Sequence, residues 1–506
     1  MKGLINEAFR QYYKLRMGRI DNFRANPHLV QSALFEKFLL AGRTTEWGKN
    51  YDYKSIKSPQ DYRERVPVQQ YEAFSPLIRR VIMGEQDVLW PGKTRWFSKS
   101  SGTTDAKSKY IPITYDNLRY CHIRSCWDSM TLLYDQRPEM RLFAAKIALM
   151  GGSLSPWPDN SKAMTGDISA IMMHNLPGVS RPNFTPDMDI ALMSNLEEKI
   201  ELMSNILPKE DVAMIGGVPT WVVVLFRKIL EKTGKENMLE VWPNFQAYMH
   251  GGVSFKPYIE QFKQFIPSDE FTYQEIYNAS EGYFGAQDDL SKEGMLLFLD
   301  NGIYYEFLPA DQWNKENPKA IGLEEVEAGV NYAIVITTNS GLWRYLPGDT
   351  IMFTSLSPYR IKVTGRTKHF VNAFGEEVMV ENTDMALAKT CRQTGTIVNE
   401  YTVAPVYFQG GSKGGHQWLI EFEKLPKDMQ LFNELLDKNL QQINSDYEAK
   451  RTKNMAMEQL QLNVLPKNTF MNWMKSKGKY GGQNKIPRLA NHRQYIDEIL
   501  MFVDRQ

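Results

Sequence analysis

The stretch from Phe97 to Ile113, FSKSSGTTDAKSKYIPI, constrains this chain more than any other. Residues 100–104 place hydroxyl-bearing side chains around a single glycine, and Lys109 follows. A loop of this composition can present backbone N–H groups, hydroxyls and an ammonium to a triphosphate. The spacing is not that of a Walker loop, and runs of Ser, Thr, Gly and Lys also form solvated turns. Other motifs must therefore decide between a phosphate-binding loop and a turn.

Length and composition limit the class of protein. At 506 residues the chain is too long for one hydrophobic core, so we expect two or more domains. The content of 42% hydrophobic and 24% charged residues is that of a globular protein, and the net charge of +1 favours neither nucleic acid nor an anionic membrane. No apolar segment follows the start methionine, and the longest apolar stretch, near residues 221–226, is too short to cross a bilayer. We expect a cytoplasmic protein.

The cysteines and histidines do not form a recognisable metal or disulfide pattern. Cys121, Cys126 and Cys391 are an odd set without CxxC spacing, which argues against a disulfide framework or a zinc ribbon. The seven histidines neither cluster with these cysteines nor form HExxH.

Hydrophobic patterning predicts helices and strands in the first two thirds of the chain. The basic opening segment has helical periodicity, and packing on its own domain is favoured over contact with a membrane. We expect a helix over about 117–134, directly after the hydroxyl-rich loop, with its positive N-terminal dipole near that loop. Strand and helix alternate over 212–250, and antiparallel strands are expected within 294–307 and 332–353.

The pattern of predicted strands and helices changes after Gly365. Strands are expected near 403–408 and 418–422, followed by a helix over 428–444. The predicted architecture is therefore mixed α/β (α+β). An N-terminal domain spans residues 1–364, and a small α+β C-terminal domain spans residues 365–506.

A second motif, YNASEGYFG at residues 277–285, follows the predicted strand FTYQEIY. Glu281 is a candidate ligand for Mg²⁺, which prefers oxygen donors. Tyr277 and Phe284 are candidates to contact an adenine face. The alternative is a surface glutamate in a turn, with the two aromatic residues in the core.

A third motif, GLWRYLPGD, ends at Asp349 after a Pro-Gly turn. A carboxylate can accept hydrogen bonds from the two vicinal hydroxyls of a ribose. The alternative is an aspartate that caps a turn.

Two further motifs lie in the predicted C-terminal domain. The segment GRTKHFVNAFGEEV begins at Gly365, where glycine permits the backbone change of a hinge, although a linker glycine and a hairpin would look the same. The segment GGQNKIPR, residues 481–488, follows several lysines. Because the net charge is near zero, a mobile loop with one functional lysine, Lys485, fits better than a nucleic-acid patch.

Taken in order, SSGTT…K, YNASE, WRYLPGD, GRTKHFVNAFGEEV and QNKIPR resemble the acyl acid amido synthetases of the Gretchen Hagen family, within the adenylate-forming superfamily. TEWGKNYDY, DYRERVPVQQYE and VLWPG in the first hundred residues are also similar to that family, so the resemblance covers nearly the whole chain. It implies a large N-terminal adenylate-forming domain of packed sheets and helices, and a small mobile C-terminal domain.

The resemblance also implies roles for individual residues. Lys485 would bridge the substrate carboxylate and the α-phosphate, and Glu281 would bind Mg²⁺, so these two are the candidate catalytic residues. The implied ATP contacts are Ser100, Ser101, Thr103 and Lys109 to the phosphates, Asp349 to the ribose, Arg366 to the nucleotide, and Tyr277 and Ser280 beside them.

Two departures from the family pattern stand out. Asp105 and Ala106 occupy loop positions where a small residue and glycine are usual, and a carboxylate beside a triphosphate repels it unless it turns away or meets the metal. Ala279 replaces the first serine of the usual YASSE, which removes one hydroxyl.

The function implied by the resemblance has two half-reactions. A carboxylate attacks the α-phosphorus of ATP, with Mg²⁺ present, and the acyl-adenylate then passes its acyl group to an amine such as an amino acid. Two alternatives stay open. One is an acyl-CoA ligase with a thiol acceptor, and the other is a nucleotide- or acyl-adenylate-binding protein without turnover. The sequence does not identify the acid or the amine.

Overall fold

A computed structural model describes residues 2–100, 109–176, 178–252, 255, 259–313, 315–367, 370–407, 414–454, 456–477, 486 and 488–504. Two of the predicted phosphate contacts, Ser101 and Thr103, lie outside these ranges, as does the candidate catalytic residue Lys485. The departures Asp105 and Ala106 lie outside them as well.

An eleven-stranded sheet forms the centre of the large N-terminal domain, in the order β12-β13-β14-β15-β11-β10-β9-β8-β7-β3-β6. One half, β6-β3-β7-β8-β9, is parallel, and every neighbouring pair from β9 through β10 to β12 is antiparallel. The strands are β3 (Lys146–Leu149), β6 (Phe184–Thr185), β7 (Val212–Gly217), β8 (Ala247–His250), β9 (Thr272–Ala279), β10 (Gly282–Ala286), β11 (Met295–Leu297), β12 (Ile303–Pro309), β13 (Asn331–Thr338), β14 (Asp349–Leu356) and β15 (Tyr359–Arg366). The predicted α/β region over 212–250 and the later antiparallel strands are confirmed.

A smaller four-stranded sheet, in the order β2-β1-β5-β4, carries the two ends of the hydroxyl-rich loop. Its strands are β1 (Trp96–Ser100), β2 (Lys109–Ile113), β4 (Leu154–Trp157) and β5 (Asn160–Gly166). The antiparallel register places Ser100 opposite Lys109, so both ends of the loop lie side by side.

The expected helix is present, as α6 (Tyr115–Asn117), a π-helical turn over Leu118–Ile123, and α7 (Arg124–Gln136). Ile111 and Ile113 are buried in β2, the strand that joins the loop to this helix. The expectation that the helix N-terminus lies near the loop concerns residues 101–108, which lie outside the described residues, and it stays a prediction.

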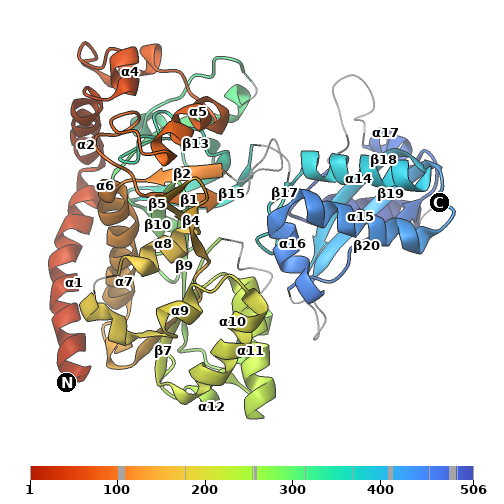
Figure 1. Ribbon diagram of the computed structural model, residues 1–506, viewed down its shortest axis with the longest axis horizontal. Helices are drawn as coiled ribbons and strands as arrows, with labels where there is room; N and C mark the ends of the chain where they lie inside the picture. The colour runs from red at the N-terminus through yellow and green to blue at the C-terminus, as the bar shows by residue number, and fades with distance from the viewer. Residues whose placement is uncertain are drawn as a thin grey trace.

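Helices cover the N-terminal domain (Figure 1). They are α1 (Lys2–Ala25), α2 (Pro27–Gly42), α3 (Glu46–Asn50), α4 (Pro59–Arg65), α5 (Tyr71–Ile82), α8 (Ile168–His174), α9 (Met188–Ala191), α10 (Leu196–Ile206), α11 (Pro219–Thr233), α12 (Met238–Val241) and α13 (Ile259–Phe265). The opening helix α1 packs on its own domain, as predicted, because the buried Arg16 guanidinium pairs with Asp128 of α7. Within the described ranges we find no helix with the length and apolar character of a membrane span.

The C-terminal domain is a three-stranded sheet with helices around it (Figure 1). Its strands are β18 (Ile397–Val406), β19 (Gly415–Lys424) and β20 (Gln461–Leu465), and its helices are α14 (Val380–Thr394), α15 (Met429–Ile443), α16 (Ser445–Arg451), α17 (Thr469–Ser476) and α18 (Gln494–Val503). A short hairpin, β16 (Phe370–Val371) and β17 (Val378–Met379), precedes α14. The helix expected over 428–444 is α15, and Asp428 caps it by accepting a hydrogen bond from the Leu431 N–H at 3.0 Å.

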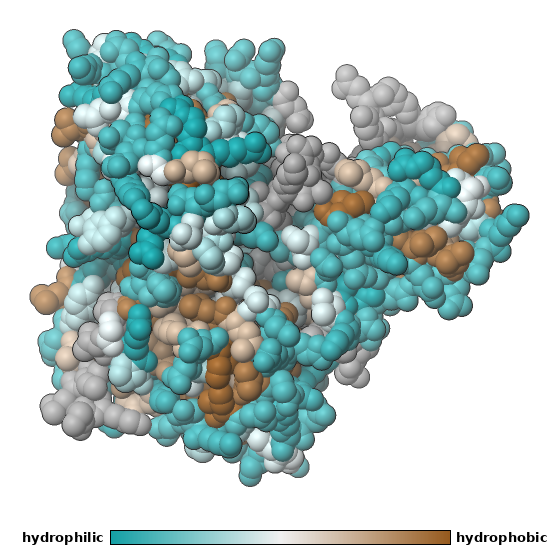
Figure 2. All heavy atoms as spheres, in the orientation of Figure 1, coloured by the Kyte–Doolittle hydropathy of each residue, from teal (hydrophilic) through white to brown (hydrophobic). Residues whose placement is uncertain are grey.

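The β16–β17 hairpin lies at the end of the C-terminal domain that faces the N-terminal domain (Figure 1). Two lysine side chains that follow α15 contact the N-terminal domain. The Lys450 Nζ lies 4.3 Å from the ring centroid of Trp221 on α11, and Lys453 pairs with Glu197 on α10. Hydrophilic residues cover most of both domains on the face in Figure 2, and the largest hydrophobic area lies near α9 and α10. The boundary at residue 365 stays a prediction.

Several residues of the third motif, GLWRYLPGD, are buried and stabilise the N-terminal domain. Trp343 is fully buried and its indole N–H donates to the Leu89 carbonyl at 2.9 Å. The buried Arg344 guanidinium donates to Glu306 at 3.0 Å and to the Arg63 carbonyl at 2.8 Å. The motif therefore ties the VLWPG segment and the loop after α4 to the large sheet.

We expect Arg344→Met to lower the free energy of unfolding by about 3–5 kcal/mol, because it leaves the buried Glu306 carboxylate without its main partner. Lys315→Met is the matched control, since it breaks only an exposed pair with Asp311 and should leave the free energy of unfolding almost unchanged. Urea denaturation followed by tryptophan fluorescence measures both. Equal small losses in the two variants would show that Arg344 has no structural role.

Candidate functional site

Glu281 lies in the two-residue turn that joins β9 to β10, between the paired residues Ala279 and Gly282. The turn is fixed to the smaller sheet, because the Ser98 hydroxyl on β1 donates to the Ser280 hydroxyl at 2.8 Å. Both Ser280 and Glu281 are buried. The predicted metal ligand therefore stands at the junction of the two sheets, near the strand that ends in Ser100.

Asp349 is the centre of a second group of predicted residues. The Tyr277 hydroxyl on β9 donates to its Oδ2 at 2.6 Å, and the Arg366 Nε on β15 lies 2.8 Å from its Oδ1. The Pro-Gly turn places Asp349 at the start of β14, directly opposite Arg366 in the register, and Gly348 adopts a φ of +98° that favours glycine. Tyr277, Asp349 and Arg366, chosen separately from sequence, are thus in contact.

Lys109 lies at the start of β2, opposite Ser100, with its Nζ 5.7 Å from the ring centroid of Tyr71. Burial lowers the pKa of Lys109, and the negative charge of Glu281 opposes that shift. The two side chains are therefore close enough to interact electrostatically. The predicted phosphate ligand and the predicted metal ligand therefore lie in the same region of the N-terminal domain.

Charges in the site are buried and mutually dependent. Burial raises the pKa of Glu281, while Lys109 and Arg366 lower it and Asp349 raises it further. The pKa of Tyr277 is also raised, first by burial and then by the Asp349 carboxylate. Such shifts mark a site in which carboxylates and cations converge away from water.

Glu281 is compatible with Mg²⁺ if other oxygen donors complete the shell. Among the residues that the structure describes, no cluster of three or more His, Cys, Asp or Glu side chains could hold a metal alone. Mg²⁺ commonly binds through one or two carboxylates, waters and the phosphates of a nucleotide. The buried Glu281 carboxylate, in its ionised form, can supply one such ligand.

Phe284 does not have the adenine-contacting role considered for it. Its ring is fully buried and lies 4.5 Å, centroid to centroid, from the ring of Tyr277. The core alternative is therefore correct for Phe284, whereas Tyr277 contacts Asp349 through its hydroxyl.

One residue of the site was not assigned a role from sequence. Glu377, in the β16–β17 hairpin, lies with its Oε1 3.7 Å from an Arg366 nitrogen. Burial lowers the pKa of Lys109. The negative charge of Glu377 raises it, as does the larger effect of Glu281. The only sequence signal for a carboxylate here is the motif GEEV, which contains both Glu376 and Glu377. The motif does not show that Glu376 is fully buried and that Glu377 is the one that reaches Arg366.

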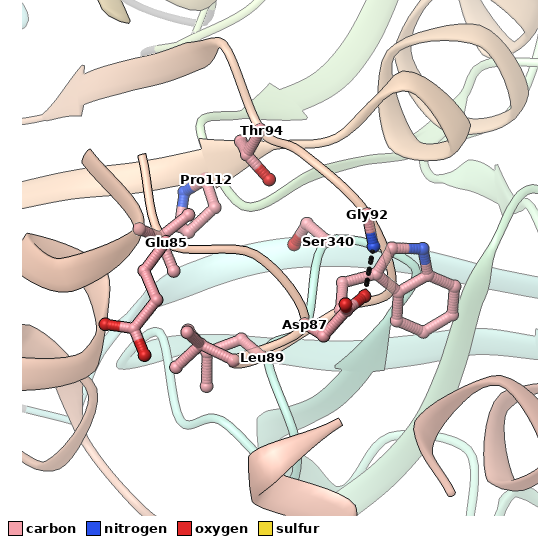
Figure 3. A pocket seen from close by; sticks show the side chains of 10 residues that line it. Glu85, Asp87, Leu89, Gly92, Thr94, Pro112 and Ser340 are labelled. Carbon is pink, nitrogen blue, oxygen red and sulfur yellow. Dashed lines mark hydrogen bonds between the residues drawn. The ribbon is translucent and has the colours of Figure 1, made fainter. Parts of the chain in front are cut away.

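A small pocket elsewhere in the N-terminal domain contains none of the predicted residues (Figure 3). Its lining comes mainly from the segment before β1, together with Pro112 and Ser340. The Gly92 N–H donates to Asp87 at 2.7 Å on its rim. The VLWPG segment thus forms a tight turn here, away from the charged site.

Comparisons with known proteins cover nearly the whole chain. Profiles of the GH3 family match in three parts: the N-terminal domain at residues 16–148 and 143–271, the central domain at 296–366 and the C-terminal domain at 381–494. The indole-3-acetic acid-amido synthetase GH3.3 of Arabidopsis thaliana is 22% identical, over 93% of this chain and 91% of that protein.

Two solved structures share the fold. AtGH3.15 acyl acid amido synthetase in complex with 2,4-DB superposes with a TM-score of 0.62 at 16% identity, covering 98% of this chain and 97% of that one. A 2-hydroxyisobutyryl-CoA ligase with 2-HIB-AMP and CoA gives a TM-score of 0.58 at 12% identity, covering 94% and 92%. The expected mixed α/β fold with a large N-terminal and a smaller C-terminal domain is confirmed.

The profiles account for more than half of the residues, and they agree with the resemblance carried by the five ordered motifs. The chain belongs to the GH3 (Gretchen Hagen) family.

Proposed function

We propose that this protein is an acyl acid amido synthetase, which uses ATP to activate a carboxylic acid as its adenylate and then transfers the acyl group to an amino acid. Family membership supports the reaction class, and the relative GH3.3 is named an indole-3-acetic acid-amido synthetase. The observation that carries the proposal is the contact of Asp349 with Tyr277 and Arg366, with the buried Glu281 close enough to interact electrostatically with Asp349 and Arg366. A carboxylate for the ribose and a cation for the phosphates are both needed to bind ATP.

In the first half-reaction the chain binds and orients ATP. Asp349, held by Tyr277 and Arg366, accepts hydrogen bonds from the ribose hydroxyls. Ser100 and Lys109 lie at the two ends of the hydroxyl-rich loop and contact the phosphates with Ser101 and Thr103. Lys485 neutralises charge between the carboxylate and the α-phosphate.

Glu281 would hold Mg²⁺ together with oxygens of the nucleotide and water. When bound, Mg²⁺ offsets negative charge on the phosphates as pyrophosphate leaves. Ser98 and Ser280 fix the turn that carries Glu281, so its carboxylate keeps one position while the substrates change.

The fold alone does not select the acceptor, because the CoA ligase shares it. An amine is favoured by membership of the GH3 family, and no described residue has been assigned to the phosphates of CoA. The identity of the acid stays open, since acyl pockets are lined by ordinary aliphatic and aromatic side chains.

We expect carboxylate-dependent exchange of labelled pyrophosphate into ATP that requires Mg²⁺, because adenylation is reversible before the acceptor binds. A panel of aryl, indolyl and fatty acids identifies the acid, and mass spectrometry then identifies the product formed with amino acids or with CoA. The expected product is an amide, formed without CoA.

Two results would contradict this proposal in different ways. Binding of ATP without exchange for any acid would indicate a nucleotide-binding protein without turnover. Exchange followed by a thioester, formed as fast as the amide or faster, would identify an acyl-CoA ligase.

Asp349→Ala should weaken ATP binding roughly 10- to 100-fold, since a hydrogen bond to a charged group contributes about 1.5–3 kcal/mol. Tyr277→Phe keeps the carboxylate and removes only the bond that orients it, so a smaller loss is expected. Calorimetric titration with ATP measures both affinities. An unchanged affinity in Asp349→Ala would remove this residue from the nucleotide site.

Glu281→Gln should lower the exchange rate on the order of 10²-fold with little change in ATP affinity, because charge develops on the phosphates only as the reaction proceeds. It should also raise the Mg²⁺ concentration needed for half-maximal exchange. Exchange kinetics over a Mg²⁺ series separate these effects, and a normal Mg²⁺ requirement in the variant would show that Glu281 is no metal ligand.

A further inference from the structure

Glu377 is a charged residue that the C-terminal domain presents to the site of the N-terminal domain. Its Oε1 lies 3.7 Å from Arg366, which also holds Asp349 at 2.8 Å. About 28% of its side chain is exposed, whereas the neighbouring Glu376 is fully buried. Glu377 can therefore meet a ligand, and Glu376 cannot.

The hairpin that carries Glu377 is held rigidly. Glu376 accepts a hydrogen bond from the Phe374 N–H at 2.6 Å, and its Oε1 lies 2.8 Å from the His416 Nε2. These buried contacts hold the loop between β16 and β17 in place. The backbone of Glu377 is held at both ends, because its N–H donates to Asn372 at 3.2 Å and its carbonyl accepts from Asn444 at 3.1 Å.

The backbone of Glu377 is also strained. Its φ is +39°, in the left-handed region that residues other than glycine rarely adopt. Such a conformation persists only where its surroundings over-determine it, and it is common at functional sites. The four hydrogen bonds around the loop supply those surroundings and direct this one carboxylate toward Arg366.

A carboxylate in this place opposes the first half-reaction. Charges of like sign repel at close range, and ATP brings several negative charges to the site. After pyrophosphate leaves, the single phosphate of the acyl-adenylate remains. The next reactant, an amino acid, then arrives with a positive ammonium group, which a carboxylate attracts.

We propose that Glu377 is a catalytic residue of the second half-reaction, where it binds the ammonium group of the amine acceptor and takes a proton from it. This inference rests on the proposed function. One ammonium proton moves to Glu377, and the nitrogen lone pair then forms the C–N bond with the acyl carbon. The C–O bond to AMP breaks, and the second amine proton is lost to the departing phosphate. Glu377 finally returns its proton to water.

The test compares two amines that differ in charge. Acyl-adenylate is prepared from the acid that gives the fastest exchange and is supplied to the enzyme with either the preferred amino acid or hydroxylamine, which is largely uncharged at neutral pH. Glu377→Gln should slow amide formation with the amino acid on the order of 10²-fold, the usual effect of a general base. Its rates with hydroxylamine and of pyrophosphate exchange should change little.

Two variants serve as controls. Glu377→Asp retains the charge and should recover part of the rate with the amino acid. Glu458→Gln removes an exposed carboxylate of the same domain and should leave all three rates unchanged.

The results separate this inference from the proposed function. An equal loss with both amines, or a loss of exchange, would show that Glu377 only positions the hairpin, and an unchanged rate would remove it from the reaction. Each of these would overturn the inference while amide synthesis by the unmodified enzyme stands. An unmodified enzyme that exchanges pyrophosphate but forms no amide with either amine would overturn both.

Discussion

Tyr277 and Arg366 both bond to the carboxylate of Asp349, and the bond from Tyr277 joins β9 to β14, which are not neighbours in the large sheet. Short strands β10 and β11 lie between β9 and β15, so side chains at the strand ends can meet across them. The same contact orients the Asp349 carboxylate. Arg366 also belongs to the last strand before the C-terminal domain, so the position of that domain and the nucleotide site depend on one another.

Local residue patterns predicted the site better than they predicted its surroundings. The turn before Asp349 and the hairpin with Glu281 each depend on a few adjacent residues, which sequence shows directly. The strand β2, which precedes the helix after the hydroxyl-rich loop, was not predicted, because the burial of Ile111 and Ile113 that makes it a strand is a tertiary effect. Glu377 could not be separated from Glu376 for the same reason, since only packing in the hairpin decides which carboxylate is buried.

One departure from the family pattern has a structural explanation. Ala279 is the last residue of β9 and packs, partly buried, against the apolar core of the N-terminal domain. The neighbouring Ser280 supplies the hydroxyl that bonds to Ser98 and fixes the turn. Loss of the first serine therefore removes no contact that holds Glu281 in place, and Ala279 does not argue for a protein without turnover.

The two half-reactions require opposite charges from the same small domain. Adenylation brings a carboxylate to a triphosphate, and a lysine such as Lys485 offsets that negative charge. Aminolysis brings an ammonium to a monophosphate ester, and there a carboxylate such as Glu377 is the favourable neighbour. Lys450 and Lys453 contact Trp221 and Glu197 in the present arrangement, in which Glu377 meets Arg366. On the proposal made above for Glu377, this is the arrangement that suits the second half-reaction.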